Sequence, residues 1–242
     1  MVVNTTIVNH SFEYTYYSYN CKVTITTTSK DDKSFVTGYT IETPRLIIRN
    51  IQNDLNDRSL HNALFKDSES IKMFGTGYFS QEQIDNMLDL WYKRLDSGIP
   101  YLGLMVFEKC DQETTTNLDS DYNKYVGHTG IPLKVDTSAS DGESILTLPM
   151  AQLEYTILLN KKFWGKGYGS EIFVAVVHCL GRAFISMGLD IKTSIYASAR
   201  VDNPASYKIL EKFGMKLFGT KHLHGFTRNQ YLLELSNDDR IE

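Results

Sequence analysis

The chain has 242 residues, of which 42% are hydrophobic and 22% charged, a composition typical of a globular protein rather than a disordered one. Its net charge of −4 argues against a broad nucleic-acid-binding surface. Three cysteines (Cys21, Cys110 and Cys179) lie far apart and form no CxxC pair, which argues against a metal site or a disulfide framework. Because no basic segment precedes an apolar core near Met1, we expect a cytoplasmic protein.

Residues 1–40 differ from the rest of the chain, because they are rich in Thr, Tyr, Asn and Ser. Their β-branched and aromatic residues alternate with polar ones, which is compatible with strands. We expect an N-terminal extension over 1–40, either a β-hairpin or a loosely attached arm, and a main domain over 41–242.

The first part of the main domain reads as a strand followed by helices. Residues 42–51 are apolar and predict a first core strand, and residues 55–66 and 81–96 predict helices. Ser80 is the expected N-cap of the second helix, with Gln83 at the capping-box position. An apolar stripe follows, formed by Ile84, Met87, Leu88, Trp91 and Leu95.

The later elements alternate between strands and helices. Strands are predicted at 101–108, 125–134 and 152–159, with polar linkers at 110–124 and 136–144. A helix over 170–187 has apolar residues at i+4 spacing and ends at Gly188. A strand at 191–197, a helix at 204–213 and strands at 216–223 and 230–235 complete the chain.

A glycine-rich turn, Trp164-Gly165-Lys166-Gly167-Tyr168-Gly169-Ser170, opens the predicted helix at 170–187. Such a turn aims backbone N–H groups and a positive helix end at one spot, which is how backbone binds a pyrophosphate. Lys161, Lys162 and Lys166 favour an anion there. A tight connection that binds nothing has the same glycines, and the spacing fits neither a Rossmann motif nor a P-loop.

A second segment, at 202–215, reads as a short capped helix. Asn203 suits the N-cap, Pro204 the first helical position and Gly214 the C-terminal end. Helix geometry alone explains all three residues. On residue types alone, a cap and a binding site are therefore equally good interpretations of Asn203 and Ser206.

Taken together, these segments resemble the GCN5-related N-acetyltransferase (GNAT) superfamily, most closely its RimJ/RimL-like branch of protein N-terminal and small-amine acetyltransferases. Further matches occur at 42–49 (ETPRLIIR), at 126–130 (VGHTG) and at 152–157 (QLEYTI). The matched segments follow the family's order, and the resemblance covers roughly residues 41–235.

The resemblance implies an α/β (α+β) fold with a mixed sheet that splays open in the middle, flanked by helices, here with an extra N-terminal β-rich extension. Acetyl-coenzyme A, the implied cosubstrate, would lie in the split, and no metal is implied. The implied cofactor-binding residues are Tyr155, Ile157, Leu158, Trp164, Gly165, Lys166, Gly167, Tyr168, Gly169, Ser170, Asn203 and Ser206. Trp164 stands where the family often has Gln or Arg.

The implied chemistry needs a base, because a primary amine is protonated at neutral pH, with pKa ~10.4 for lysine and ~7.7–8.0 for an α-amine. The catalytic candidates are Glu154, Asn203 and Ser206: Glu154 as the base, Asn203 as a hydrogen-bonding partner of the pantetheine arm and Ser206 near the sulfur. The related branch usually has Glu two residues earlier, where this chain has Gln152, so Glu154 as a polar rim residue is an equal alternative. His128 is a second candidate base.

We therefore expect an acetyl-coenzyme-A-dependent N-acetyltransferase that acts on a primary amine, a protein N-terminus or a small amine, by direct attack in a ternary complex. The alternatives are a catalytically silent acyl-CoA-binding sensor or regulatory module, and a structural protein whose glycine turn binds nothing. No nucleic acid or membrane partner is expected, and the chain would be a monomer or homodimer. Family analogy places Phe74, Gly75, Tyr78 and Trp91 at the acceptor pocket, and a position in the core is an equally good interpretation of the aromatic residues among them.

Overall fold

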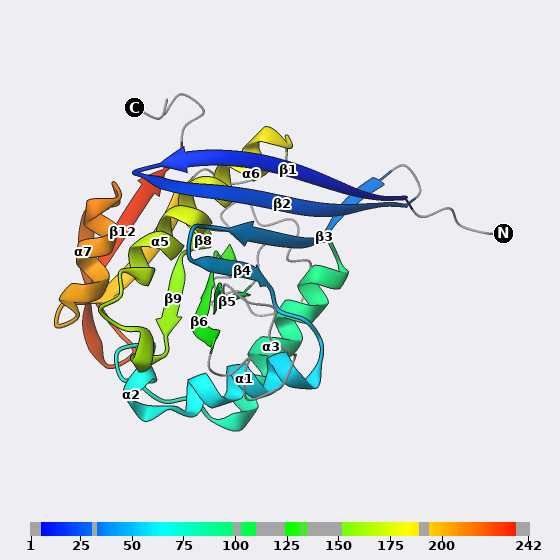
Figure 1. Cartoon of the computed structure of the whole chain (residues 1–242). Helices are drawn as coiled ribbons and strands as arrows, with labels where there is room; N and C mark the ends of the chain where they lie inside the picture. Colours follow the sequence, from blue (N-terminus) through cyan, green and yellow to red (C-terminus); the bar gives the residue numbers. More distant parts are fainter. Residues whose placement is uncertain are drawn as a thin grey trace.

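A computed structural model describes residues 6–30, 33–98, 103–109, 124–131, 133–134, 152–188 and 194–235. A seven-stranded sheet runs through the centre of the molecule in the order β1-β2-β3-β4-β5-β6-β9, and all neighbours in it are antiparallel (Figure 1). Its strands are β1 (Thr6–Tyr16), β2 (Tyr19–Lys30), β3 (Lys33–Glu42), β4 (Leu46–Asn50), β5 (Gly103–Glu108), β6 (Tyr125–Gly130) and β9 (Thr156–Leu159).

A second sheet has five strands in the order β11-β12-β10-β8-β7. They are β7 (Leu133–Lys134), β8 (Gln152–Glu154), β10 (Ser194–Arg200), β11 (Lys216–Leu223) and β12 (Phe226–Glu234). β10 and β8 are parallel and the other neighbours antiparallel, so the fold is mixed.

The two sheets part at Tyr155, which lies between β8 and β9. The Tyr155 amide donates a 2.7 Å hydrogen bond to the Tyr196 carbonyl of β10, and beyond that point β9 pairs with β6 instead. The single strand predicted over 152–159 is thus divided between two sheets. This division confirms the expected mixed fold with a centrally splayed sheet.

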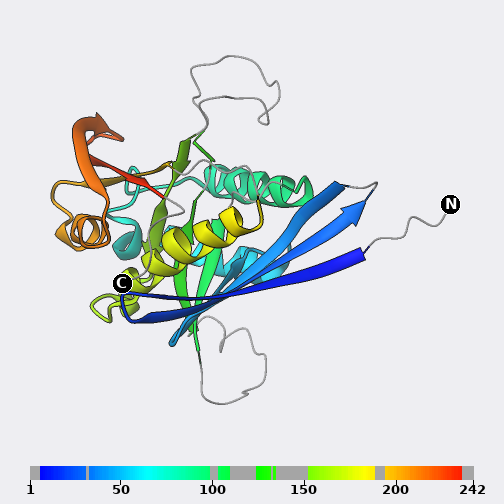
Figure 2. The same ribbon diagram turned by 90° about the horizontal axis from the view of Figure 1, so that it is seen from above.

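Helices cover both faces of the seven-stranded sheet (Figures 1 and 2). α1 (Leu55–Lys66), the short α2 (Ser68–Ile71) and α3 (Gln81–Asp96) lie on one side. The predicted capping box of α3 is present, since Ser80 and Gln83 exchange side chain to backbone hydrogen bonds. On the other side runs a continuous helix over 168–186, and α7 (Pro204–Lys212) packs beside its first turns.

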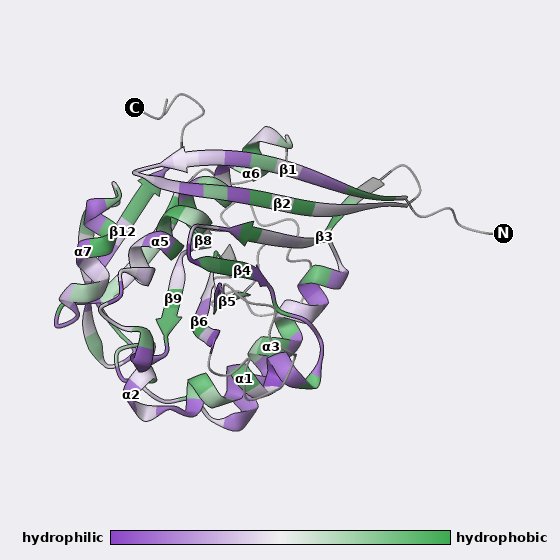
Figure 3. Cartoon of the chain, viewed as in Figure 1, coloured by the Kyte–Doolittle hydropathy of each residue, from purple (hydrophilic) through white to green (hydrophobic). Residues whose placement is uncertain are grey.

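The continuous helix over 168–186 is the central core element. It consists of α5 (Tyr168–Phe173), a π-helical segment η2 (Val174–Leu180) and α6 (Gly181–Ser186). In the described part of the chain it is the one helix long and apolar enough to cross a membrane by length and composition, but 78% of its most apolar window is buried inside the molecule. It therefore serves as a core helix. β4, the middle strand of the seven-stranded sheet, and β9, its last strand, are also largely hydrophobic (Figure 3).

Residues 6–30 form an antiparallel hairpin that lies across the central helix (Figure 2). Val23 and Ile25 of β2 are fully buried, and the Tyr16 ring stacks on His178 of η2 with centroids 4.0 Å apart. Residue 40, the predicted end of the extension, lies within β3. β3 pairs with both the hairpin and β4, so the sheet continues across this boundary. The division into an extension over 1–40 and a domain over 41–242 stays a prediction.

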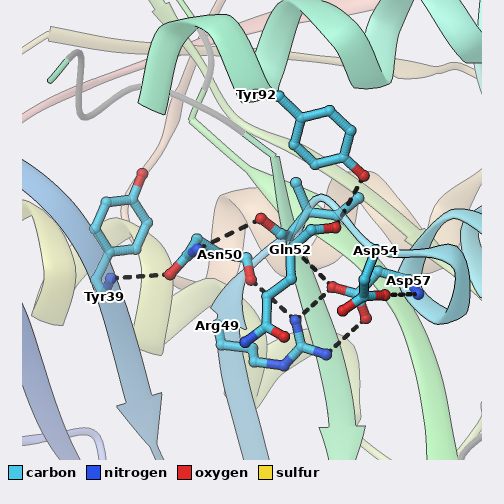
Figure 4. Close-up of polar contacts among 8 residues, drawn as sticks. Tyr39, Arg49, Asn50, Gln52, Asp54, Asp57 and Tyr92 are labelled. Carbon is cyan, nitrogen blue, oxygen red and sulfur yellow. Dashed lines mark hydrogen bonds and ion pairs between the residues drawn. The ribbon is translucent and has the colours of Figure 1, made fainter. Parts of the chain in front are cut away.

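An ion pair joins the sheet to the helices on the side of α1 and α3 (Figure 4). Arg49 of β4 donates hydrogen bonds of 2.6 and 2.7 Å to both carboxylate oxygens of Asp57 in α1, whose side chain is fully buried. The Gln52 amide also donates to Asp57, and the Tyr92 hydroxyl of α3 donates to the Gln52 carbonyl. These bonds fix α1 and α3 against the sheet.

Candidate active site

A cavity of about 810 Å³ opens where the two sheets separate. One wall is residues 154–159 of β8 and β9, and the other is residues 197–200 of β10. The glycine turn, the start of α7 and the segment between α2 and α3 complete it. Among the described strands β9 is the edge of its sheet, so its backbone groups on the cavity side are available to a ligand.

The structure brings the predicted cofactor-binding residues to this one cavity, with Lys166 as the exception. Those that line it are Tyr155, Ile157, Leu158, Trp164, Gly165, Gly167, Tyr168, Gly169, Ser170, Asn203 and Ser206. Lys166 instead places its ammonium 4.8 Å from the centre of the Phe163 ring. Lys161 forms a 2.7 Å ion pair with Glu69, which offsets the positive charge predicted for the turn. The binding roles of these residues stay predictions.

The backbone geometry of the turn explains why glycine stands at two of its positions. Gly165 and Gly167 have φ of 75° and 79°, in the left-handed region that favours glycine. A Cβ on Gly165 would meet nothing within 4 Å, so open space lies beside it. Gly167 is the N-cap of α5 and offers no side chain to cap the helix, so the first helical amides remain suited to an anion.

A buried carboxylate anchors the turn from behind. Glu171, with no exposed surface, accepts hydrogen bonds from Thr43 Oγ1 (2.5 Å), the Arg45 amide (3.1 Å) and Arg45 Nε (2.7 Å). Arg45 Nη1 also donates to the Lys166 carbonyl (2.8 Å), and its guanidinium lies 4.5 Å from the centre of the Tyr168 ring. Both ends of this contact belong to segments noted in the sequence, but no local signal predicted that they meet.

The predicted catalytic residues face the same cavity. Glu154 is half-buried at the end of β8, directly before the point of separation. Asn203 is the N-cap of α7, where its Oδ1 accepts a 3.3 Å hydrogen bond from the Ser206 amide. Asn203 and Ser206 thus cap the helix as predicted and also line the cavity.

His128, the second candidate base, lies in the core rather than in the cavity. It is 2% exposed, stacks on Trp91 with centroids 4.7 Å apart and is absent from the cavity lining among the described residues. Burial lowers the pKa of His128 to about 3. The geometry therefore argues against His128 as the base, because a strand residue on the core-facing side cannot reach a ligand in the split.

The expected acceptor residues are only partly in place. Phe74 and Gly75 line the cavity, whereas Trp91 is 4% exposed in the core and Tyr78 is outside the described lining. Of the two interpretations of Trp91, the core position holds, because Trp91 belongs to the buried face of α3. Among the described residues, no group of three or more His, Cys, Asp or Glu side chains could hold a metal ion.

Sequence reasoning missed two arginines of the cavity, Arg200 and Arg228. Arg200 Nη2 forms a 2.5 Å ion pair with Asp202, and Arg228 donates from Nε to Ser198 Oγ (3.1 Å) and from Nη2 to the Ser198 carbonyl (3.2 Å). They occupy paired positions on β10 and β12, a register that no local pattern revealed.

Known proteins share this fold. A family model described as acetyltransferase (GNAT) domain matches residues 45–216. Similar solved structures include a GNAT-family acetyltransferase from Bacillus anthracis, with 21% identity over 81% of this chain and 98% of that chain and a TM-score of 0.53. Another is the Salmonella typhimurium acetyltransferase that modifies the N-terminal serine of ribosomal protein L7/L12 (18% identity, 80% and 96%, TM-score 0.53).

A third is spermidine N-acetyltransferase from Vibrio cholerae in complex with CoA and spermine (15% identity, 78% and 95%, TM-score 0.51). At these identities the solved structures show the shared fold, whereas the family model spans most of the chain. The chain therefore belongs to the GNAT family, and it is an N-acetyltransferase whose acetyl donor is acetyl-coenzyme A.

Proposed function

We propose that this enzyme is a RimJ/RimL-like acetyltransferase that acetylates a primary amine, a protein N-terminus or a small amine, by direct attack in a ternary complex. The observation that carries the proposal is that Glu154, Asn203, Ser206 and the glycine turn face one cavity at the sheet split. We further propose that it acts in the cytoplasm as a monomer or homodimer, without nucleic acid or membrane.

The residues of the cavity fit acetyl-coenzyme A. The open edge of β9 offers backbone groups to the amides of pantetheine, and the uncapped helix start beyond Gly167 suits a pyrophosphate. The space beside Gly165 leaves room for phosphate oxygens. Acetyl-coenzyme A, when bound, supplies a thioester that an amine can attack.

Side chains of this protein accept and donate the protons of the reaction. Glu154 accepts the proton that the ammonium form of the acceptor must lose, directly or through water. A backbone amide near Ile157, on the open edge of β9, stabilises developing negative charge on oxygen. Ser206 holds a hydroxyl proton for the departing thiolate, which needs little help because a comparable thiol has a pKa of ~8.5.

The test is calorimetric titration with acetyl-coenzyme A, followed by thiol release with a panel of amines. We expect binding, thiol release with at least one amine, and a large loss of turnover but not of binding in Glu154→Gln. The matched control is Glu82→Gln, an exposed carboxylate in the first turn of α3. Binding with no thiol release for any amine would favour the silent sensor, and no binding would overturn the proposal.

A second variant tests the turn itself. Gly167→Val should abolish coenzyme A binding, because a branched side chain at φ 79° strains the turn and blocks backbone approach to the pyrophosphate. Gly188→Val is the control, since Gly188 has a similar φ of 67° at the far end of the same helix. Retained affinity in folded Gly167→Val would reject the turn as the pyrophosphate site.

A further inference from the structure

The cavity has a second side, formed by residues that share one face of the five-stranded sheet. Across the antiparallel pairing of β10 and β12, Ser198 is opposite Gln230 and Arg200 is opposite Arg228, and Glu154 of β8 is opposite Tyr196. Directly opposed residues project to the same face, and alternate residues of a strand share it. Glu154, Ser198, Arg200 and Arg228 therefore lie on one face, and all four line the cavity.

Hydrogen bonds hold the Arg228 side chain in place, but they do not use all of its N–H donors. It is 8% exposed, and Ser198 accepts from its Nε and Nη2 atoms. Its Nη1 is buried and has no hydrogen-bond partner among the described residues. A guanidinium carries five N–H donors, and a buried donor left without an acceptor is destabilising. Burial lowers the pKa of Arg228, and the charge of Glu154 opposes that shift, so the two groups interact electrostatically.

The cavity lining holds two guanidinium groups and two carboxylates among its described residues. Arg200 is compensated by Asp202 and lies 3.6 Å from the centre of the Phe226 ring. Apart from His224, the other charged side chains of the lining are Glu154 and Arg228. A carboxylate suits an ammonium group, and a guanidinium suits a carbonyl or carboxylate oxygen. A polyamine offers cations alone and has no oxygen for Arg228.

We propose that Arg228 binds the oxygen of a carbonyl or carboxylate group attached to the carbon that carries the reacting amine, so that the acceptor is an α-amino-acid unit and not a polyamine. The amine lies near Glu154 and the adjacent carbonyl or carboxylate oxygen accepts a hydrogen bond from the Arg228 guanidinium. This inference rests on the proposed function of the site. A peptide N-terminus and a free amino acid share this chemistry.

The test uses conjugates in which an acetyl bridge joins the coenzyme A sulfur to the amine of an acceptor, with affinities measured by calorimetry. The first acceptor is alaninamide, and the second is its isostere in which an isopropyl group replaces the carboxamide. Wild-type protein should bind the alaninamide conjugate at least tenfold more tightly than the isostere. Conjugates of alanine and of trialanine distinguish a free amino acid from a peptide N-terminus, and a spermidine conjugate should bind weakly.

Arg228→Gln should remove the preference between alaninamide and its isostere while leaving the affinity for coenzyme A unchanged. Lys221→Gln is the matched control: Lys221 lies opposite Arg228 on β11, is exposed, and is absent from the described lining. It should keep the wild-type preference. Equal affinity of wild-type protein for both conjugates, or tightest binding of the spermidine conjugate, would overturn the inference even if the variant does not fold. Failure to bind coenzyme A itself would overturn the proposed function instead.

Discussion

Arg45, directly before β4, connects this part of the sheet to the glycine turn. Replacing it by alanine removes its hydrogen bonds to the buried carboxylate of Glu171 and to the Lys166 carbonyl. We expect Arg45→Ala to lose about 1–3 kcal/mol of unfolding free energy, the cost of an under-satisfied buried group. The KM for acetyl-coenzyme A should rise several-fold with a smaller change in kcat, because the turn loosens while Glu154 stays in place.

The measurements are urea unfolding and steady-state kinetics. Arg58→Ala is the control, because Arg58 pairs with Asp85 and Asp89 at the surface, where such pairs contribute about 0–1 kcal/mol. Equal losses in the two variants would show that Arg45 is an ordinary surface arginine.

Asn203 caps α7 and also lines the cavity. A substitution can distinguish its contribution to stability from its contribution to catalysis. Asn203→Ala should lose about 1 kcal/mol of stability from the missing cap. Its kcat should fall roughly tenfold or more, as a lost hydrogen bond of about 1.4 kcal/mol to the bound cofactor implies. Asp54→Ala removes the N-cap of α1, away from the cavity, and should change stability alone. An unchanged kcat in folded Asn203→Ala would reduce Asn203 to a cap.

At the scale of elements, β6 and α1 bring His128 and His61 together in the core, with ring centroids 5.5 Å apart. Burial lowers the pKa of both, that of His128 from 6.5 to about 3. Below pH 6.5 the unfolded chain therefore binds more protons than the folded one, and stability falls as pH falls. The slope should reach about 1.4 kcal/mol per pH unit for each histidine, down to the folded pKa.

Urea unfolding at several values between about pH 7.5 and about pH 5 measures this slope. His128→Gln cannot titrate, so its slope should be about half that of the wild-type protein. His222→Gln, at an exposed position of β11, is the control. Identical slopes for His128→Gln and wild type would contradict the assignment.

At the scale of the whole molecule, the N-terminal hairpin contributes to the same core as the residues that line the cavity. Ile25 of β2 has no exposed surface and belongs to the hydrophobic core that the described residues form. Ile25→Ala should lower the unfolding free energy of the entire chain by about 2–5 kcal/mol, as a typical core truncation does. Lys22→Ala, on the exposed face of the same strand, should change it by less than about 0.5 kcal/mol.

Differential scanning calorimetry of the full chain tests this prediction. A single transition that moves to lower temperature is the expected result. A main transition unchanged by Ile25→Ala would show that residues 1–40 fold as a separate arm.

Local patterns predicted the elements whose signals are local. Ser80, Gln83 and the apolar stripe defined α3, and Asn203 and Gly214 defined α7. The division of 152–159 into β8 and β9 depends on which strand each half pairs with. The apolar sequence of this segment does not indicate those partners.

The same limit applies to the site. Residues of the turn and of α7 were predicted because motif and resemblance named them. The contact of Glu171 with Arg45 spans 126 residues, and the position of Arg228 depends on the register of β12, so neither was predictable from a window of sequence.

The order of strands also has a consequence for how the chain folds during synthesis. β1 to β6 are neighbours in the sheet in the order in which they leave the ribosome, so each strand finds its partner already present. Glu171 follows Thr43 by 128 residues, so the contact that anchors the turn forms only after this later part of the chain has been made. A nascent chain halted before Glu171 would already contain β1 to β6 in their order in the sheet. It would lack the carboxylate that anchors the turn. The capacity to hold coenzyme A thus arises late in translation, after the scaffold that supports it.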